Sequence, residues 1–239
     1  GGNLPVRIAK NPFLAQLLFK NAYQNVAPSR YLHSAFQQQG YTNVTFIPNA
    51  ISIADYLLAS RSFTEPRLLW VRSFSSLYNP KMAISVFAQI QQVYPKAQLY
   101  MVGPGSQQVL EECKKLAVAL QVDVLFTGKL SKSDWISLSK KCTIFINTTH
   151  FDNTPVSVIE AMALGLPVVS TNVGGIPFLL THQQTALLVP DSDVNAMVNA
   201  IQEIMSNTDL RAQLIANARA EVVQFDWDIV KLKWFEILK

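Results

Sequence analysis

The chain has 239 residues, of which 49% are hydrophobic and 15% are charged, and its formal net charge is +4. This composition is typical of a well-packed globular protein and excludes a disordered or fibrous chain. No apolar run reaches the roughly 18–20 residues that a membrane-spanning helix needs, so we expect no transmembrane segment. Cys113 and Cys142 have neither metal-ligand spacing nor the density of a disulfide framework, which favours a reducing, cytoplasmic location.

The first 54 residues hold 4 basic side chains and no acid, whereas the rest of the chain holds 16 of each sign. Such a segment either has an ordinary solvated surface or makes peripheral contact with an anionic membrane or a phosphate, and both alternatives stay open. The pattern NAYQNVAPSRYLHSAFQQQGY predicts a short strand, a serine cap and a helix over about 30–39. A second strand follows in VTFIPNAI. We interpret residues 1–48 as the tail of a preceding β/α domain with its linker.

From residue 66 onward, short apolar runs alternate with helical patterns. The runs are rich in Val, Ile, Leu and Phe and lack strict alternation, which is typical of strands covered on both faces. The predicted strands are 67–72, 98–102, 122–126, 143–147, 167–170 and 186–189. The predicted helices cover about 80–93, 106–120, 131–140, 155–164, 174–181, 192–205, 207–223 and 227–238. These β-α units predict a doubly wound parallel sheet over 49–225, and 226–239 form a terminal helix that packs back toward the first domain.

In an open parallel sheet, ligands bind beyond the carboxyl ends of the strands, where helices begin. The most informative such place is TTHFDNTP, which leads from strand 143–147 into the short apolar helix 155–164. Thr154 is its predicted N-cap, and Pro155 its first residue. A helix N-terminus favours phosphate, because its first N–H groups have no partner within the helix. The N–H groups that would bind phosphate belong to Asn153, Thr154, Val156 and Ser157.

Two carboxylates accompany this helix: Asp152 lies just before it, and Glu160 lies inside its apolar stretch VSVIEAMALG. The side chain of Glu160 leans back toward the helix N-terminus, so its carboxylate is placed to hydrogen-bond vicinal hydroxyls of a ligand beside the phosphate. Asp152 would hold a second polar group on the far side of that phosphate. The alternatives are an ordinary N-terminal acid for Asp152 and a pair with an internal Arg or Lys for Glu160.

Three further places have weaker signals. Arg72 ends an apolar strand, where its cation either clamps a diphosphate or pairs at the surface. The Gly-Pro-Gly turn at 103–105 is more typical of a structural turn than of a phosphate loop. Gly174 and Gly175 either let the backbone approach a ligand closely or fit a tight turn. No Cys, His or Asp group has metal-ligand spacing, so we expect no metal site.

The block from Asp152 to Glu160, followed by AMALGLPVVSTNVGG, resembles the E-x7-E region of retaining nucleotide-sugar glycosyltransferases of family 4, also called glycosyl transferases group 1. The similarity continues in VAPSRYL, LLWVRSF, QLYMVGPGS, VLFTGKLSKSDW and FDWDIVKLKWFEIL, in the family's order. That family has the GT-B fold, in which two Rossmann-like domains face each other across a cleft. The resemblance implies that this chain is the C-terminal, donor-binding part, preceded by the tail of the acceptor domain.

The resemblance also implies roles for single residues. Glu160 would bind the ribose hydroxyls of a nucleoside-diphosphate sugar, Asp152 the hydroxyls of the donor sugar, and Arg72 the leaving diphosphate. The backbone contacts would come from Asn153 and Thr154 for the distal phosphate, and from Gly128, Lys129 and Leu130 for the base. The implied reaction transfers a hexosyl group with retention of configuration to a sugar, glycolipid or protein acceptor. It needs no cofactor or obligatory metal, and it implies no nucleic-acid partner.

Several positions depart from the family's pattern. They are Asp152 in place of a longer Glu, Val71 in place of Gly, Asn79 and Pro80 in place of Lys-Gly, and Phe178 in place of an acid. Lys81 aligns with the family's lysine only after a shift, so we carry no diphosphate role onto it. Because little of an acceptor domain is present, we expect the isolated chain to be weakly active or inactive. The alternative function is a non-catalytic nucleotide- or sugar-binding module.

Overall fold

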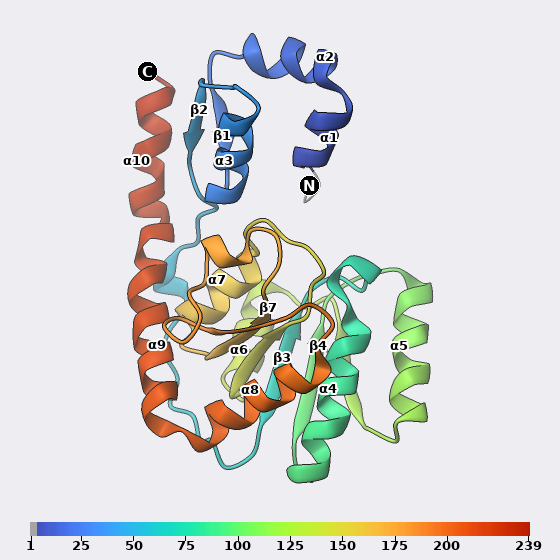
Figure 1. Cartoon of the computed structure of the whole chain (residues 1–239). Coiled ribbons are helices and arrows are strands. Elements are labelled where there is room, and N and C mark those ends of the chain that lie inside the picture. Colours follow the sequence, from blue (N-terminus) through green and yellow to red (C-terminus); the bar gives the residue numbers. More distant parts are fainter. Residues whose placement is uncertain (1–3) are drawn as a thin grey trace.

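A computed structural model describes residues 4–239. The larger of its two parts is built around a six-stranded parallel sheet (Figure 1). The strands are β3 (Arg67–Val71), β4 (Gln98–Val102), β5 (Val124–Gly128), β6 (Ile144–Asn147), β7 (Val168–Thr171) and β8 (Leu187–Val189). Their spatial order is β5-β4-β3-β6-β7-β8, with every neighbouring pair parallel. Counted from β3, this is the order 3-2-1-4-5-6 of a Rossmann-like sheet, which confirms the predicted fold class.

Helices cover both faces of this sheet. One face packs against α4 (Pro80–Val93), α5 (Gln107–Ala119) and α8 (Val194–Ser206), and the other against α6 (Lys132–Ser139) and α7 (Val156–Ala163). α9 (Thr208–Val222) contributes side chains to both cores. Along β3, Leu68 and Trp70 face the first core and Leu69 the second, and all three are fully buried. This two-sided burial explains why the strands are apolar without alternation.

The N-terminal residues form a smaller unit with a separate core. β1 (Asn25–Ala27) pairs in parallel with β2 (Val44–Phe46), and α3 (Arg30–Gln38) connects the two strands. They are preceded by α1 (Leu4–Lys10), α2 (Pro12–Ala15) and a π-helical turn, Gln16–Lys20, none of which we predict from the sequence. Ile8, Leu32, Phe36 and Val44 belong to the core of this unit. The domain boundary at 48 stays a prediction, and residues 1–3 of that segment lie outside the described residues.

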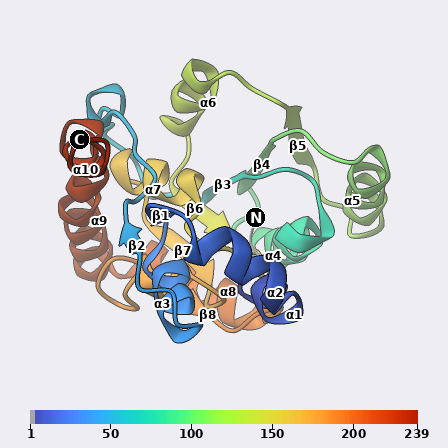
Figure 2. The same ribbon diagram turned by 90° about the horizontal axis from the view of Figure 1, so that it is seen from above.

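The last helix, α10 (Trp227–Ile237), continues from α9 and runs beside the N-terminal unit (Figures 1 and 2). The ammonium of Lys233 lies 5.4 Å from the ring centroid of Phe46 in β2. The segment after β2 is fixed where α9 is followed by α10, because Ile51 N donates to Phe225 O (2.9 Å) and Trp227 N donates to Ile51 O (2.8 Å). Within residues 4–239, no helix has the length and apolar character that crossing a membrane requires.

Most predicted elements differ from the structure by one or two residues at their ends, and two further differences have a visible cause. β5 begins two residues later than the predicted strand 122–126, because the chain first turns at Gln121, whose φ is +56°. The predicted helix 174–181 is wrong, since only a short 3-10 helix, Ile176–Phe178, forms there. The backbone N–H of Gly175 is bonded to the loop after β6 and the chain turns at once, so a regular helix does not extend.

Candidate functional site

A cavity of about 510 Å³ opens beyond the carboxyl ends of β3, β4, β5 and β6. β3 and β6 are the adjacent strands at which the order of the sheet reverses, so the loops that follow them diverge and leave a crevice. Seven residues with predicted site roles line this cavity: Arg72, Lys129, Leu130, Asp152, Thr154, Val156 and Ser157. Tyr78 and Trp135 line it as well, without a predicted role, and for Ser157 we predict from the sequence a role of the backbone N–H only.

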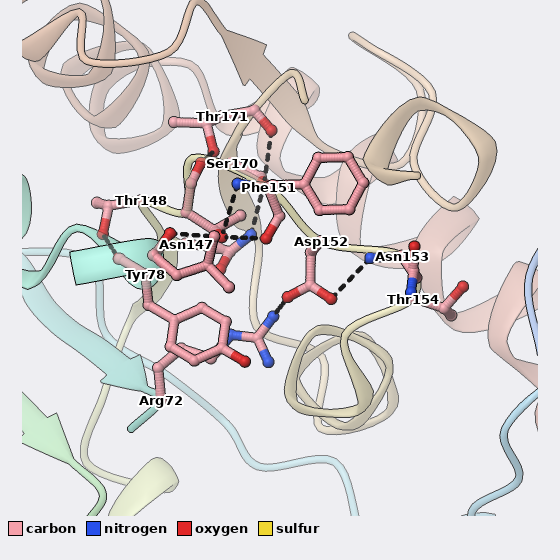
Figure 3. A network of polar contacts seen from close by, with 12 residues as sticks. Arg72, Tyr78, Asn147, Thr148, Phe151, Asp152, Asn153, Thr154, Ser170 and Thr171 are labelled. Carbon is pink, nitrogen blue, oxygen red and sulfur yellow. Dashed lines mark hydrogen bonds and ion pairs between the residues drawn. The ribbon is translucent and has the colours of Figure 1, made fainter. Parts of the chain in front are cut away.

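Arg72 and Asp152 form an ion pair at this cavity, and both side chains are largely buried, with 14% and 16% exposed. The guanidinium carbon of Arg72 lies 4.6 Å from the ring centroid of Tyr78. Figure 3 shows the guanidinium between this ring and the carboxylate of Asp152. Burial lowers the pKa of Arg72 to about 10, so the guanidinium still carries its charge at neutral pH. The alternative of a surface pair for Arg72 is therefore wrong in one respect: the pair forms, but out of solvent.

The other oxygen of Asp152 accepts a hydrogen bond from the backbone N–H of Asn153, with Oδ1 and N 2.8 Å apart (Figure 3). This is one of the N–H groups that we predict for phosphate. In the described structure, the carboxylate of Asp152 thus contacts both a cation and an N–H group that the sequence assigns to a diphosphate. Asp152 is consequently more than an ordinary helix-terminal acid.

Hydrogen bonds from neighbouring strands hold the loop that carries Asp152. Trp70 Nε1 donates to Thr148 Oγ1 (3.1 Å), which ties the loop to β3. Thr171 Oγ1 at the end of β7 donates to Thr149 O (2.6 Å). Thr149 Oγ1 in turn donates to Phe151 O (2.8 Å). The loop is thus bonded to both neighbouring strands, and Figure 3 shows Thr148, Phe151 and Thr171 above the ion pair.

The glycine pair at 174–175 lies directly against the same loop. A Cβ atom added at Gly175 would lie closer than 3.0 Å to Asn153 O, a separation that real Cβ atoms essentially never show. Gly174 has a φ of +52° and similarly faces Asp152 O. Gly175 N also donates to Asp152 O at 2.7 Å. The close backbone approach that the glycines permit is therefore to the chain's own loop.

α7 begins at Val156, and Pro155 occupies its N-cap position with a φ of −68° and a ψ of +116°. The prediction that Thr154 is the N-cap is wrong, because the extended backbone at Pro155 delays the helix by one residue. Pro155 makes no side-chain hydrogen bond to this end of the helix, so the first N–H groups of α7 have no side-chain cap among residues 4–239.

Apart from Arg72 Nη2 and Asp152 Oδ2, which form the ion pair, two side-chain polar atoms of the residues that line this cavity are buried and have no hydrogen-bond partner within residues 4–239. They are Ser157 Oγ, in the first turn of α7, and Arg72 Nε. Buried polar atoms in proteins are nearly always paired, so these two are candidate contacts for a bound ligand or an ordered water. The sequence offers a signal for Ser157, because its hydroxyl is three residues from Glu160 and thus on the same helical face.

Glu160 lies one turn further along α7, 6% exposed, and is not among the described residues that line the cavity. Its Oε1 accepts a hydrogen bond from Tyr56 OH (2.6 Å) and lies 3.1 Å from Lys132 Nζ. The alternative of a lysine pair is thus realised, although the Lys132 side chain is 55% exposed and not internal. We predict neither partner from the sequence: Tyr56 lies between β2 and β3, 104 positions before Glu160.

The remaining predicted positions lie at or near the cavity. Gly128 ends β5 with a φ of +69° and so turns the chain toward Lys129 and Leu130, which line the cavity. Lys81 is directed elsewhere, because its ammonium lies 2.7 Å from Glu112 Oε2 on α5. Among residues 4–239, no group of three or more His, Cys, Asp or Glu side chains is placed to hold a metal ion.

The family model described as Glycosyl transferases group 1 matches residues 60–221. This range is more than half of the chain, and it includes every residue that lines the cavity. The chain belongs to the glycosyl transferases group 1 family.

Proteins similar to this group 1 chain include two curated glycosyltransferases. Glycogen synthase of Mycobacterium tuberculosis is 24% identical over 199 residues, which are 80% of this chain and 47% of the relative. The 2-deoxystreptamine N-acetyl-D-glucosaminyltransferase of Niallia circulans is 29% identical over 140 residues, which are 59% of this chain and 36% of the relative. The chain therefore spans about half or less of the length of these relatives.

Solved structures agree with the group 1 assignment in their fold. Anabaena HepE in complex with UDP-glucose superposes with a TM-score of 0.84 at 22% identity, covering 96% of this chain and 67% of HepE. Sucrose-phosphate synthase from Thermosynechococcus elongatus gives a TM-score of 0.85 at 22% identity, covering 96% of this chain and 61% of that one. At such identities the likeness establishes the fold, which is of the GT-B type.

Proposed function

We propose that this chain binds a nucleoside-diphosphate sugar in the cavity and is the donor-binding part of a retaining hexosyltransferase of family 4. One observation carries the proposal: a buried cation, Arg72, and the uncapped N-terminus of α7 border the same cavity at the switch point of the sheet. The unpartnered atoms Arg72 Nε and Ser157 Oγ support a ligand rich in hydrogen-bonding oxygens. A UDP-glucose complex of HepE, a protein of the same fold, supports the ligand class.

In this proposal, the diphosphate binds between Arg72 and the first turn of α7. Its oxygens accept hydrogen bonds from the guanidinium, from Ser157 Oγ and from the N–H groups of Thr154 and Val156. When the bond to the sugar breaks, negative charge develops on the leaving diphosphate. A charge that forms in a partly buried site is stabilised by a fixed cation and a helix N-terminus without solvent reorganisation. Arg72 therefore acts as a catalytic residue, and the reaction proceeds without an obligatory metal.

Asp152 is the proposed contact for the donor sugar. Its carboxylate pairs with Arg72 and with Asn153 N–H, the groups that the diphosphate also requires. As the phosphate oxygens take over these contacts, the carboxylate becomes available to sugar hydroxyls next to the scissile bond. Because Asp is one methylene shorter than the family's Glu, we expect the hydroxyl it reaches to lie closer to the loop.

Glu160 is the proposed ribose ligand, and the turn of Gly128, Lys129 and Leu130 is the proposed contact for the base through its backbone. Glu160 follows Val156 and Ser157 by one turn on one face of α7, so a ribose attached to the bound phosphate extends toward it. A carboxylate acceptor for ribose hydroxyls forms charge-assisted hydrogen bonds, which are stronger than neutral ones.

Membrane contact is part of the proposal for the N-terminal unit, with a cytoplasmic location. Phe13 is 78% exposed and Leu18 64% exposed, next to the basic residues Lys10 and Lys20. Exposed apolar side chains among basic ones bind anionic bilayers by both burial and charge. Vesicle co-sedimentation checks this contact: binding that does not change with the fraction of anionic lipid contradicts it. The acceptor is a sugar, a glycolipid or a protein.

A non-catalytic nucleotide- or sugar-binding module is the second candidate. It is favoured by the pairing of Lys81 with Glu112, which directs the Lys81 ammonium toward α5 and away from the cavity. A module of this kind would bind the nucleoside diphosphate and show neither transfer nor hydrolysis of any nucleotide sugar when joined to a complete acceptor domain. Turnover of a nucleotide sugar in that setting excludes it.

Calorimetric titration of UDP, GDP and ADP tests the proposed function. We expect one of the three nucleotides to bind. Glu160→Ala should lower the affinity for that nucleotide by about tenfold or more, since a hydrogen bond to a charged group contributes about 1.5–3 kcal/mol. Glu236→Ala, on the exposed side of α10, is the matched control and leaves the affinity unchanged. If none of the three nucleotides binds, or if both variants bind as the wild type does, the proposed site is wrong.

A further inference from the structure

Glu160 is held by two groups from outside α7, and both reach the same carboxylate oxygen. Tyr56 OH donates to Oε1 at 2.6 Å, and Lys132 Nζ lies 3.1 Å from Oε1. The second oxygen, Oε2, takes part in neither contact. The carboxylate is therefore fixed through one oxygen while the other has no part in this pairing.

Tyr56 is a rigid partner. Its side chain is fully buried in the core beneath α7, and its backbone carbonyl accepts a hydrogen bond from Arg219 Nη1 at 3.0 Å. Burial, and next the hydrogen bond to Glu160, raise the pKa of Tyr56. The phenol consequently stays protonated and acts as a donor toward Glu160 at every pH at which the protein works.

Lys132 is the exposed partner, and it joins the pair to the cavity. It is the first residue of α6, shortly after Lys129 and Leu130, which line the cavity. Its ammonium lies 5.4 Å from the centroid of the Tyr56 ring, so the cation, the ring and the carboxylate form one compact group. Since half of its side chain is in water, Lys132 holds the carboxylate less firmly than Tyr56 does.

We propose that Tyr56 is a positioning residue for ribose recognition: by holding Oε1 it presents Oε2 of Glu160 to the ribose hydroxyls, with Lys132 as a weaker second support. This inference rests on the proposed function, because it takes Glu160 as the ribose ligand. A free glutamate side chain loses rotamer freedom when it binds a hydroxyl, and a side chain already ordered by Tyr56 does not. Ordering before binding therefore raises affinity only for ligands that have the hydroxyls.

The test compares a nucleoside diphosphate with its 2′-deoxy and 3′-deoxy analogues, using whichever of UDP, GDP or ADP binds in the first titration. The measured quantity is the ratio of the Kd of the deoxy analogue to the Kd of the parent. Tyr56→Phe keeps the ring and removes the hydroxyl. We expect this variant to raise the Kd of the parent nucleotide by about three- to tenfold and to change the Kd of the deoxy analogue by less than about twofold. The ratio then falls, whereas a purely structural loss weakens both ligands equally.

The matched control is Tyr100→Phe. The Tyr100 hydroxyl donates to Gln98 Oε1 at 2.9 Å near the start of β4, at the end of the strand remote from the cavity. Its removal should leave the ratio at the wild-type value. Lys132→Met probes Oε1 of Glu160 from the exposed side and should lower the ratio by less than Tyr56→Phe does. It also serves if Tyr56→Phe does not fold.

The outcomes separate the two proposals. If Glu160→Ala keeps the wild-type ratio, Glu160 is not the ribose ligand and the proposed function loses this assignment. If Glu160→Ala brings the ratio near one while Tyr56→Phe keeps the wild-type ratio, the ribose site stands and the positioning role is overturned. If Tyr56→Phe is unfolded and Lys132→Met keeps the wild-type ratio, the positioning role is overturned as well.

Discussion

Replacing Gly175 by alanine tests whether the glycine pair positions the loop that carries Asp152 and Asn153. Gly175 has a φ of −86° and a ψ of −3°, which alanine adopts without strain, so the only new feature is the methyl group. That methyl would lie closer than 3.0 Å to Asn153 O, whereas ordinary contact begins at 3.4 Å. The neighbouring atom belongs to the backbone and has no rotamer to change, so the loop itself has to move.

We expect the loop to shift by on the order of 1 Å, a displacement that can lower site function about a hundredfold. The nucleoside diphosphate that binds the wild type should therefore bind Gly175→Ala roughly ten- to a hundredfold more weakly. The free energy of unfolding should fall by about 1–3 kcal/mol, as for other overpacked positions. Calorimetric titration measures the first quantity, and urea unfolding monitored by circular dichroism measures the second.

Gly40→Ala is the control for stability. Gly40 has a φ of +83° and no atom within 4 Å of the added Cβ, so alanine there costs about 1–2 kcal/mol of backbone energy without touching the site. Its nucleotide affinity should stay within about twofold of the wild type. The reasoning is refuted if Gly175→Ala binds the nucleotide as tightly as Gly40→Ala does, because the close approach would then have no part in forming the site.

Three further predictions concern single side chains. Arg72→Lys keeps a charge but loses the planar guanidinium and its stacking on Tyr78, so we expect the affinity for a nucleoside diphosphate to fall by about tenfold. The control Lys81→Met, which removes the partner of Glu112, should have the wild-type affinity, and equal affinities of the two variants would contradict the role of Arg72. Ser157→Ala should lower the nucleotide affinity by about two- to tenfold and leave the free energy of unfolding unchanged or higher, because it removes a buried hydroxyl that lacks a partner. A variant that is less stable but has the wild-type affinity would show that Ser157 has a structural role only. Burial raises the pKa of the Cys142 thiol from 9.0 to about 12, so the stability that the thiol contributes is fully present below pH 9.0 and is lost as the pH rises toward 12. Between about pH 8 and pH 10.5, the free energy of unfolding in urea should therefore fall less in Cys142→Ala than in the wild type, and equal decreases would contradict a buried thiol.

Much of the fold follows from local patterns that the sequence displays. The continuous apolar runs at 68–71 and 144–146 form most of β3 and β6, because strands buried on both faces need no polar positions there. Their positions in a repeated β-α order then place the loops after them at the switch point of the sheet. For this reason the loop of Asp152 and the helix N-terminus after it could be predicted as a site before any side-chain contact was known.

The side-chain partners could not be predicted in the same way, because they depend on which segments meet in three dimensions. Tyr56 reaches Glu160 across 104 positions, and nothing in the sequence around it distinguishes this tyrosine from an ordinary core residue. The contact of Asp152 with Arg72 depends on the adjacency of β3 and β6. The close fit of Gly175 depends on the loop of Asn153, which is separated from it in the sequence by α7 and β7. Periodicity reports which faces are buried, and it does not report what lies opposite them.

The most direct test of the central claim is the position of a bound nucleoside diphosphate, determined from crystals of the chain soaked with UDP, GDP or ADP. The account predicts that the diphosphate lies between the Arg72 guanidinium and the first turn of α7, with a ribose hydroxyl in hydrogen-bond distance of Glu160. A nucleotide bound on another face of the molecule, or bound in this cavity with its ribose directed away from Glu160, would contradict it.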